Sequence, residues 1–353
     1  MQDRAGDHEQ RPDAPRVAVI IPAYNAERFI RLCLDGIRDL DYPRDHIEVV
    51  VVDNGSVDRT REIAVAHGVR VLDLPVGLVG AVRNHGVKAT TSDYLAFIDS
   101  DCVPGRDWLK RAVALLGADA ELGGVGGICL APATASWIER AWAQNRHADL
   151  RERASLAASS LIVRRRDFET VGGFDERMSA GEDYELSRRL RSCGLRLVAV
   201  PECAVYHWGW PRTFAEVYRR QVWQGSNQLR AAKGPLDPSL LLVHLFVLAP
   251  LLGVLLSLVL GPASPLAWSP LLLNLAIPGL ASVHRSRASA SLGRRLVKAA
   301  RLYPVFWAYY LGRSVGLVQN YAGLVRTSPA RTAKTWGRHA TRAERERDDH
   351  TAD

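Results

Sequence analysis

Short apolar runs alternate with segments of helical periodicity over the first hundred residues, and this alternation most narrowly limits the fold. The runs cover 16–21, 47–52, 69–72 and 94–98. A strand buried on both faces is apolar throughout, whereas a strand with one exposed face alternates. The pattern therefore predicts an α/β fold in which a largely parallel sheet has helices on both faces.

Polar residues follow these runs directly. The first run is followed by Pro22, Ala23, Tyr24 and Asn25. Asp53 ends the second run, and Asp99 ends the fourth. Ligands of open α/β sheets bind beyond the carboxyl ends of the strands. We therefore expect these residues to border one binding site.

The C-terminal third is apolar enough to enter a membrane. Residues 239–260 are nearly free of charge and about as long as the ~20 residues that cross a bilayer. Residues 266–283 follow after a Gly/Pro turn, with breaks expected at Pro270 and Pro278, and the two stretches predict a membrane hairpin. A buried helix of a soluble protein is the alternative for each stretch.

Basic residues set the orientation of that hairpin. We predict a loop over 284–301, which contains arginines and a lysine but no acid. Such loops stay in the cytoplasm, which places the catalytic domain there as well. A third apolar stretch, 303–325, either spans the membrane or lies at its surface, and we prefer spanning. The prediction is a multi-pass protein of the cell (inner) membrane.

Composition narrows the possible partners. The formal net charge of +8 suits an anionic partner, either a phosphate-bearing substrate or an acidic membrane surface. Nucleic acid is not indicated, because the arginines are scattered and no basic helix carries interleaved aromatic residues. The five cysteines show no disulfide or metal-ligand spacing, which indicates reduced thiols. Residues 1–15 lack the apolar core of a signal peptide and are predicted to be a disordered tail.

Six motifs in a fixed order carry a family resemblance. They are Ile20–Asn25, Asp53–Asp58, Gly80–Gly86, Asp99–Asp101, Val171–Asp175 and Gly181–Leu186. In this order the chain resembles the family 2 glycosyltransferases. The resemblance implies a GT-A fold, which is a Rossmann-like mixed sheet, together with a nucleotide-diphosphate sugar donor, a divalent metal (Mn2+ or Mg2+) and inversion at the anomeric carbon.

The resemblance covers roughly residues 16–230, and together with the apolar stretches it suggests how the chain is divided. We expect a tail over 1–15, a GT-A domain over 16–235, a membrane region with two or three transmembrane helices over 236–325, and a charged tail over 326–353. A hexosyl- or deoxyhexosyltransferase with a lipid-linked or membrane-proximal acceptor, in cell-envelope glycan biosynthesis, fits this arrangement. Segments 137–153 and 214–233 have amphipathic helical spacing and would pack on the core or lie on the bilayer.

Donor-binding roles follow from the residue types. Asp53 could accept the ring N–H of a uracil, thymine or guanine base, with residues 22–25 as the opposite wall. A turn or helix cap is the structural alternative for Asp53. Arg83 could steady the diphosphate or the donor sugar, unless it forms a surface ion pair. Asp99 is predicted to contact a ribose or sugar hydroxyl.

Metal-binding and catalytic roles are carried by four further residues. Asp101 is predicted to bind the metal that neutralises a departing diphosphate. By resemblance, His207 completes the metal coordination and Asp183 is the base that deprotonates the acceptor. Glu182 would orient the acceptor or the base. The alternatives are a polar turn at Asp101, a structural histidine, and helix capping by the acid pair.

Other functions remain open at this stage. A catalytically silent nucleotide-sugar-binding scaffold subunit would keep the fold without turnover. A nucleotidyltransferase would need a glycine-rich, lysine-bearing loop after the first strand, and Pro22–Asn25 is not one. Processive synthases that resemble this family carry a Gln-x-x-Arg-Trp motif, which Tyr218–Gln224 only loosely matches. Transfer of a single sugar is therefore favoured.

Overall fold

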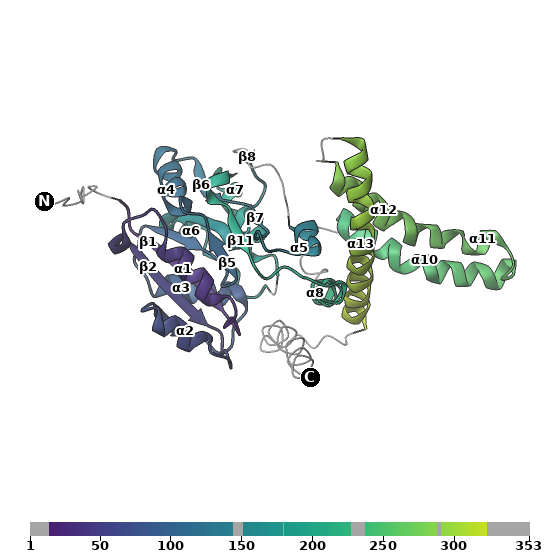
Figure 1. Cartoon of the computed structure of the whole chain (residues 1–353), viewed down its shortest axis with the longest axis horizontal. Helices are drawn as coiled ribbons and strands as arrows, with labels where there is room; N and C mark the ends of the chain where they lie inside the picture. Colours follow the sequence, from purple (N-terminus) through teal and green to yellow (C-terminus); the bar gives the residue numbers. More distant parts are fainter. Residues whose placement is uncertain (1–13, 144–150, 179, 227–236, 288–290, 323–353) are drawn as a thin grey trace, which may run out of the picture.

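The computed structural model describes residues 14–143, 151–178, 180–226, 237–287 and 291–322. An α/β domain lies at one end of an elongated molecule and a group of long helices at the other (Figure 1). The predicted tails fall largely or wholly outside the described residues, as do 144–150 and 227–233 of the two amphipathic segments.

An eight-stranded mixed sheet forms the centre of the α/β domain. Its order is β3 (Arg70–Asp73), β2 (Ile47–Asp53), β1 (Val17–Ala23), β4 (Tyr94–Phe97), β9 (Leu161–Arg164), β6 (Leu122–Gly126), β10 (Arg196–Ala199) and β8 (Arg151–Glu152). Strands β3, β2, β1 and β4 are parallel, whereas β9 and β8 run antiparallel to their neighbours. The predicted α/β class is confirmed. The chain order reverses between β1 and β4, where binding sites of such sheets lie.

Helices cover both faces of the sheet. The helices of this domain are α1 (Ile30–Arg38), α2 (Thr60–Ala66), α3 (Val79–Lys88), α4 (Trp108–Ala118), α5 (Trp137–Trp142), α6 (Arg165–Thr170) and α7 (Glu182–Ser192). Three short 3-10 turns, 44–46, 158–160 and 201–203, connect other elements. Helices α1 and α4 share one apolar core, and α3, α6 and α7 share the other. Successive side chains of β1 enter opposite cores, which explains why its sequence is apolar throughout.

A smaller three-stranded sheet lies beside the main one. Its order is β5 (Cys102–Pro104), β11 (Val205–His207) and β7 (Cys129–Leu130). Strand β11 pairs antiparallel with β5, so that His207 lies opposite Cys102. This pairing brings the segment just after Asp101 against a segment more than one hundred positions later in the chain.

The helical region contains α8 (Phe214–Ser226), α10 (Pro238–Leu260), α11 (Pro265–Trp268), the 3-10 turn Ser269–Leu271, α12 (Leu272–Ser286) and α13 (Leu292–Tyr321). Helices α10 to α12 form a hairpin that projects away from the α/β domain, while α8 lies against α13 (Figure 1). Among the described residues, two segments are long and apolar enough to cross a membrane, Pro238–Leu260 and Pro265–Ser286. Most of their side chains are not buried by other parts of the chain.

Three local predictions are wrong. The helix expected over 137–153 ends at Trp142, and Arg151–Glu152 instead pair with β10 as an edge strand. The loop expected over 284–301 is largely helical, because arginine, lysine, leucine and alanine are good helix formers whatever their charge implies about the membrane. Pro270 does interrupt the second apolar stretch, but Pro278 lies inside α12.

Candidate active site

Arg83 of α3 connects the end of β4 to the start of α7. Its two terminal nitrogens donate to Glu182 Oε1 and to Asp99 Oδ1, each at 2.7 Å. The side chain is buried, and its guanidinium lies over the ring of Phe174 at 5.4 Å from the centroid. The surface ion pair considered for Arg83 is therefore wrong. Two acids that are far apart in the sequence are held together by one buried cation.

Asp183 follows Glu182 in the first turn of α7. Gly181 precedes the helix with φ +80°, a backbone conformation that favours glycine. The Asp183 carboxylate accepts backbone hydrogen bonds from Tyr184 at 2.7 Å and Ala158 at 3.4 Å. Burial, and then the charge of Glu182, raise the pKa of Asp183 to about 6, against the opposing effect of Arg83. A carboxylate with this pKa is suited to accept a proton near neutral pH.

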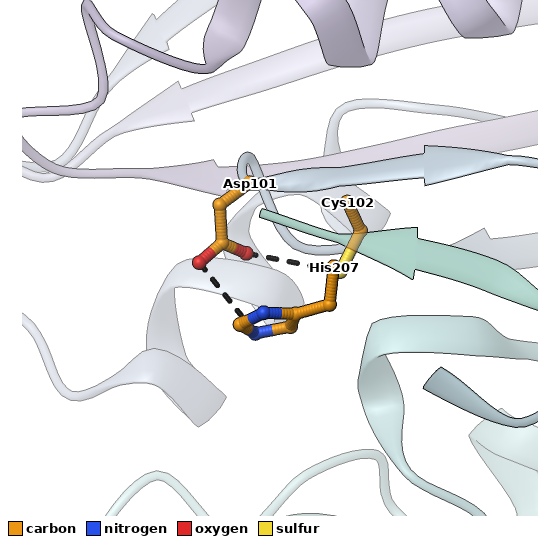
Figure 2. A group of neighbouring side chains, drawn as sticks. All are labelled: Asp101, Cys102 and His207. Atoms are coloured by element: carbon orange, nitrogen blue, oxygen red, sulfur yellow. Dashed lines mark hydrogen bonds and ion pairs between the residues drawn. The ribbon is translucent and has the colours of Figure 1, made fainter. Parts of the chain in front are cut away.

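Asp101, Cys102 and His207 form a buried cluster whose potential ligand atoms lie within 4.8 Å of one another (Figure 2). His207 Nε2 is 3.6 Å from Asp101 Oδ2, and Cys102 Sγ is 3.7 Å from Asp101 Oδ1. Burial, followed by the charges of Asp101 and Asp99, raises the pKa of Cys102 well above its usual value, so the thiol stays protonated. Carboxylate and imidazole are therefore the stronger ligands of this cluster.

Three observations fit a divalent cation at this cluster. His207 Nδ1 is buried and has no hydrogen-bond partner. A Cβ on Gly209 would overlap the Asp101 carboxylate, so only glycine leaves that side of the carboxylate open. A carboxylate is a ligand type that Mg2+ and Mn2+ prefer, and an imidazole is a common ligand of divalent transition metals.

Asp53 lies at a different edge of the site. Its Oδ1 accepts hydrogen bonds from the backbone N–H (3.1 Å) and the hydroxyl of Ser56, so the turn considered for Asp53 is present. Asn25, with φ +47°, donates its backbone N–H to Ser56 Oγ and accepts one from the Val57 N–H, both at 2.9 Å. These bonds join the loop 22–25 to the loop after β2. Base recognition by Asp53, and the opposite wall formed by Pro22, Ala23 and Tyr24, stay predictions.

The structure brings most of the predicted site residues together in two linked groups. Asp99, Arg83, Glu182 and Asp183 form one network, and Asp101 with His207 forms the second, two positions beyond Asp99. Cys102, Gly209, Trp210 and Arg220 were not predicted. The loose match of Tyr218–Gln224 to the synthase motif was the available signal for Arg220. Nothing in the sequence pattern marked the other three.

Comparison with known protein sequences identifies similar proteins. A family model described as "Glycosyl transferase family 2" matches residues 18–171. Glycosyltransferase AglE of Haloferax volcanii is 30% identical over 230 residues, which are 61% of this chain and 74% of that protein. The pre-mycofactocin glycosyltransferase of Mycobacterium tuberculosis is 31% identical over 225 residues, 57% of this chain. The match spans 45% of that relative's length.

A solved structure shows the same fold. Mannosyltransferase PcManGT from Pyrobaculum calidifontis, solved with GDP-Man and Mn2+, aligns with a TM-score of 0.54 and 23% identity. The alignment covers 90% of this chain and 89% of that one. With these matches and the mixed sheet described above, the chain belongs to the family 2 glycosyltransferases and is a glycosyltransferase with a GT-A fold.

Proposed function

We propose that this protein is an inverting, metal-dependent glycosyltransferase that moves one sugar from a nucleotide-diphosphate donor, with Asp183 as the base. The observation that carries the proposal is the position of Asp183. Its pKa is raised to about 6, and it lies next to Glu182, which Arg83 joins to Asp99. Asp183 is therefore connected, through its neighbour Glu182 and the side chain of Arg83, to Asp99 in the loop that also carries Asp101.

A single displacement follows from these positions. The acceptor hydroxyl oxygen forms a bond to the anomeric carbon while the bond from that carbon to the diphosphate oxygen breaks. Asp183 takes the hydroxyl proton, and the electron pair of the broken bond leaves with the diphosphate. One displacement inverts the anomeric centre. Glu182, fixed by Arg83, orients the acceptor or Asp183, and Asp99 binds a ribose or sugar hydroxyl.

Asp101 and His207 would hold the divalent metal. When bound, Mn2+ or Mg2+ neutralises charge that develops on the leaving diphosphate. Two observations support this assignment. Among the described residues, His207 Nδ1 is buried without a hydrogen-bond partner, and the lack of a side chain at Gly209 leaves one side of the Asp101 carboxylate open. The presence of Mn2+ and GDP-Man in the PcManGT structure supports both the metal and the class of donor.

We place the acceptor at the membrane. Helix α10 and the α11–α12 segment are the two candidate spans, and the α/β domain would remain on the cytoplasmic side, where the donor would be available. Helix α13 would lie at the interface with α8 and not cross, because Arg313 bonds to Gln221 and Gln224 of α8. A lipid-linked or membrane-proximal acceptor fits this placement.

The test is nucleotide release by the purified full chain from a panel of uridine-, thymidine- and guanosine-diphosphate sugars with Mn2+ or Mg2+. Release should require the metal and should be lost in Asp101→Ala and Asp183→Asn, but not in Asp39→Asn, which removes an exposed acid. Unchanged turnover in both site variants would contradict the assigned roles. A donor that binds but stays intact with every acceptor would favour the silent scaffold subunit.

A further inference from the structure

Unpaired nitrogens gather in the segment that follows β11. Among the described residues, three N–H donors of this part of the chain are buried and lack a hydrogen-bond partner: Trp208 Nε1, Trp210 Nε1 and Arg220 Nε. Buried donors without a partner are costly and uncommon in native proteins. Their concentration within thirteen positions, beside the predicted metal ligands, indicates a site that receives a ligand rich in acceptor oxygens.

Arg220 is the charged member of this group. From α8, its Nη1 donates to the carbonyl oxygen of Gly209 at 3.0 Å, and its guanidinium lies 5.7 Å from the ring centroid of Trp210. Among the described residues no carboxylate lies within ion-pair distance of it. Burial lowers the pKa of Arg220, while the charges of Asp101 and Asp99 act in the opposite direction. The guanidinium is therefore desolvated, near both acids, and not neutralised by direct contact.

Arg83 differs from Arg220 in this respect. Both terminal nitrogens of Arg83 are occupied by the carboxylates of Asp99 and Glu182. Its Nε, like that of Arg220, is buried without a hydrogen-bond partner among the described residues, but the two carboxylates already neutralise the charge of Arg83. Arg220 can offer its charge to an anion without breaking an ion pair, so it is the stronger candidate for an anionic ligand.

Gly209 brings Arg220 close to the metal cluster. Its carbonyl oxygen accepts from Arg220, and a Cβ at the same residue would overlap the Asp101 carboxylate. A single residue therefore separates the guanidinium from the predicted metal ligand. A diphosphate is long enough to contact a metal at Asp101 and a cation on the other side of Gly209.

We propose that Arg220 and the indole N–H of Trp210 bind the diphosphate of the sugar donor. The inference rests on the proposed function, because it identifies the group that receives the donor's phosphates. A phosphate on a lipid acceptor would offer the same chemistry. The diphosphate is favoured because Arg220 lies near Asp99 and Asp101, the acids assigned to the donor and the metal, and no observation connects it with Asp183, the base at the acceptor.

Helix α13 supports this position of Arg220. Arg313 donates to Gln221 Oε1 at 2.7 Å and to Gln224 Oε1 at 2.8 Å. Gln221 is the residue after Arg220, so the helix that carries the guanidinium is fixed from its other side. A rigid helix holds a binding group more accurately than a loop does.

The experiment measures binding of UDP, GDP and inorganic pyrophosphate, with UMP and GMP alongside, to the full chain in detergent with Mn2+. Arg220→Gln should weaken the binding of pyrophosphate, and of whichever nucleoside diphosphate binds best, by about 10-fold to 100-fold. The monophosphates should change much less. Trp210→Phe keeps an aromatic side chain, although a smaller one, but removes the N–H, and should cost about 3-fold to 10-fold. Arg219→Gln removes the same charge from the neighbouring position and should bind like wild type.

Three results would overturn the proposal. Diphosphate affinity that is equal in Arg220→Gln and wild type would remove Arg220 from the site while leaving the proposed function intact. A raised KM for the acceptor with an unchanged KM for the donor would assign Arg220 to an acceptor phosphate. No diphosphate binding by wild type would overturn both proposals. Arg220→Lys, which keeps the charge and helix propensity, distinguishes lost binding from lost folding: it should bind with intermediate affinity.

Discussion

Asp183 and Glu182 are neighbours with different electrostatic surroundings. Glu182 accepts a charged hydrogen bond from Arg83, whereas within the described part of the chain Asp183 accepts hydrogen bonds from backbone N–H groups alone. Burial and the Glu182 charge raise the pKa of Asp183 to about 6. Two adjacent carboxylates in such different environments are expected to have different tasks, one fixed in place and one free to take a proton.

The pH dependence of turnover tests this division. A base acts only when deprotonated, so kcat/KM should rise as pH increases through about 6 and level off above 7. Asp183→Asn should lower kcat by about 10²-fold to 10⁴-fold and remove this limb of the profile. Steady-state rates from pH 5 to 8 give the answer. A profile that stays flat from pH 5 to 8 would contradict a base with the raised pKa of Asp183.

The raised pKa of Asp183 also affects the stability of the fold, which should fall with increasing pH over the range in which turnover rises. Because the folded state holds the Asp183 proton more tightly than the unfolded chain does, stability falls as pH rises from about 4 to 6. Asp183→Asn cannot ionise, so it should unfold at a higher temperature than wild type at pH 8. The two proteins should converge near pH 3.5. Thermal unfolding in detergent measures this, and a variant less stable than wild type at pH 8 would contradict the desolvation argument.

Gly209 allows a test of the metal site that changes no ligand. The methyl group of Gly209→Ala would collide with the Asp101 carboxylate. The variant should need at least about 10-fold more Mn2+ for half-maximal activity, since a misplaced ligand loses affinity. Gly293→Ala, where a Cβ meets nothing within 4 Å, is the matched control. If both variants needed the same Mn2+ concentration, we would conclude that the metal binds away from Asp101.

Sequence reasoning succeeded for residues whose position in the chain reveals their place in the sheet. Asp53 ends β2 and Asp99 lies two positions beyond the end of β4, so their location at the carboxyl edge could be predicted. The contact between Arg83 and Glu182 joins residues ninety-nine positions apart, and no periodicity encodes it. Arg220 was missed because its significance depends on the absence of a carboxylate partner, which only the folded chain reveals.

Helices α8 and α13 pack through glycines, and this contact connects the helical region to the site. A Cβ at Gly312 would lie 2.5 Å from the Tyr218 carbonyl oxygen, and one at Gly316 would overlap that of Val222. Asn320 also donates to the Ser226 carbonyl oxygen. Small residues allow two helix backbones to approach closely, so that van der Waals contact and hydrogen bonds combine.

Enlarging one of these glycines should separate the two helices. Gly316→Leu should lower the unfolding temperature and reduce activity, because α8 carries Arg220 and is displaced with it. Overpacking of this kind typically costs about 1–3 kcal/mol. Gly293→Leu lies in the same helix at a position where a Cβ would meet nothing within 4 Å, and it should keep both properties. If Gly316→Leu retained full activity with a normal diphosphate affinity, the position of α8 would not depend on α13.

At the level of elements, strands were predicted more accurately than the segments that border them. The four early strands lie within two residues of their predicted limits, because each is a largely apolar run bounded by polar residues. The short strand β8 could not be anticipated, since two residues carry no periodicity and pair only because β10 offers them an edge. The start of α13 was missed because a basic segment was equated with a loop.

The whole molecule is polarised along its length. The α/β domain occupies one end, the apolar hairpin of α10 to α12 projects from the other, and α8 and α13 lie between them (Figure 1). The sequence located the apolar stretches, but it left open whether 303–325 spans. In the structure α13 includes most of this stretch and packs along α8, with Arg313 in polar contact. The proposed position of α13 at the membrane surface rests on this contact.

Labelling by a membrane-impermeant maleimide tests that topology. Native Cys193 is exposed on the α/β domain and reports the side on which this domain lies. In a Cys193→Ser background, Ala263→Cys at the tip of the hairpin should react only from the opposite side of sealed vesicles. Leu292→Cys and Ala322→Cys, at the two ends of α13, should both react from the Cys193 side.

Reaction of position 263 from the Cys193 side would mean that the hairpin lies on the bilayer. Reaction of 322 from the opposite side would show that α13 crosses, and α8 would then have to follow it into the membrane, since Gly316 and Val222 leave no room for lipid between the two helices.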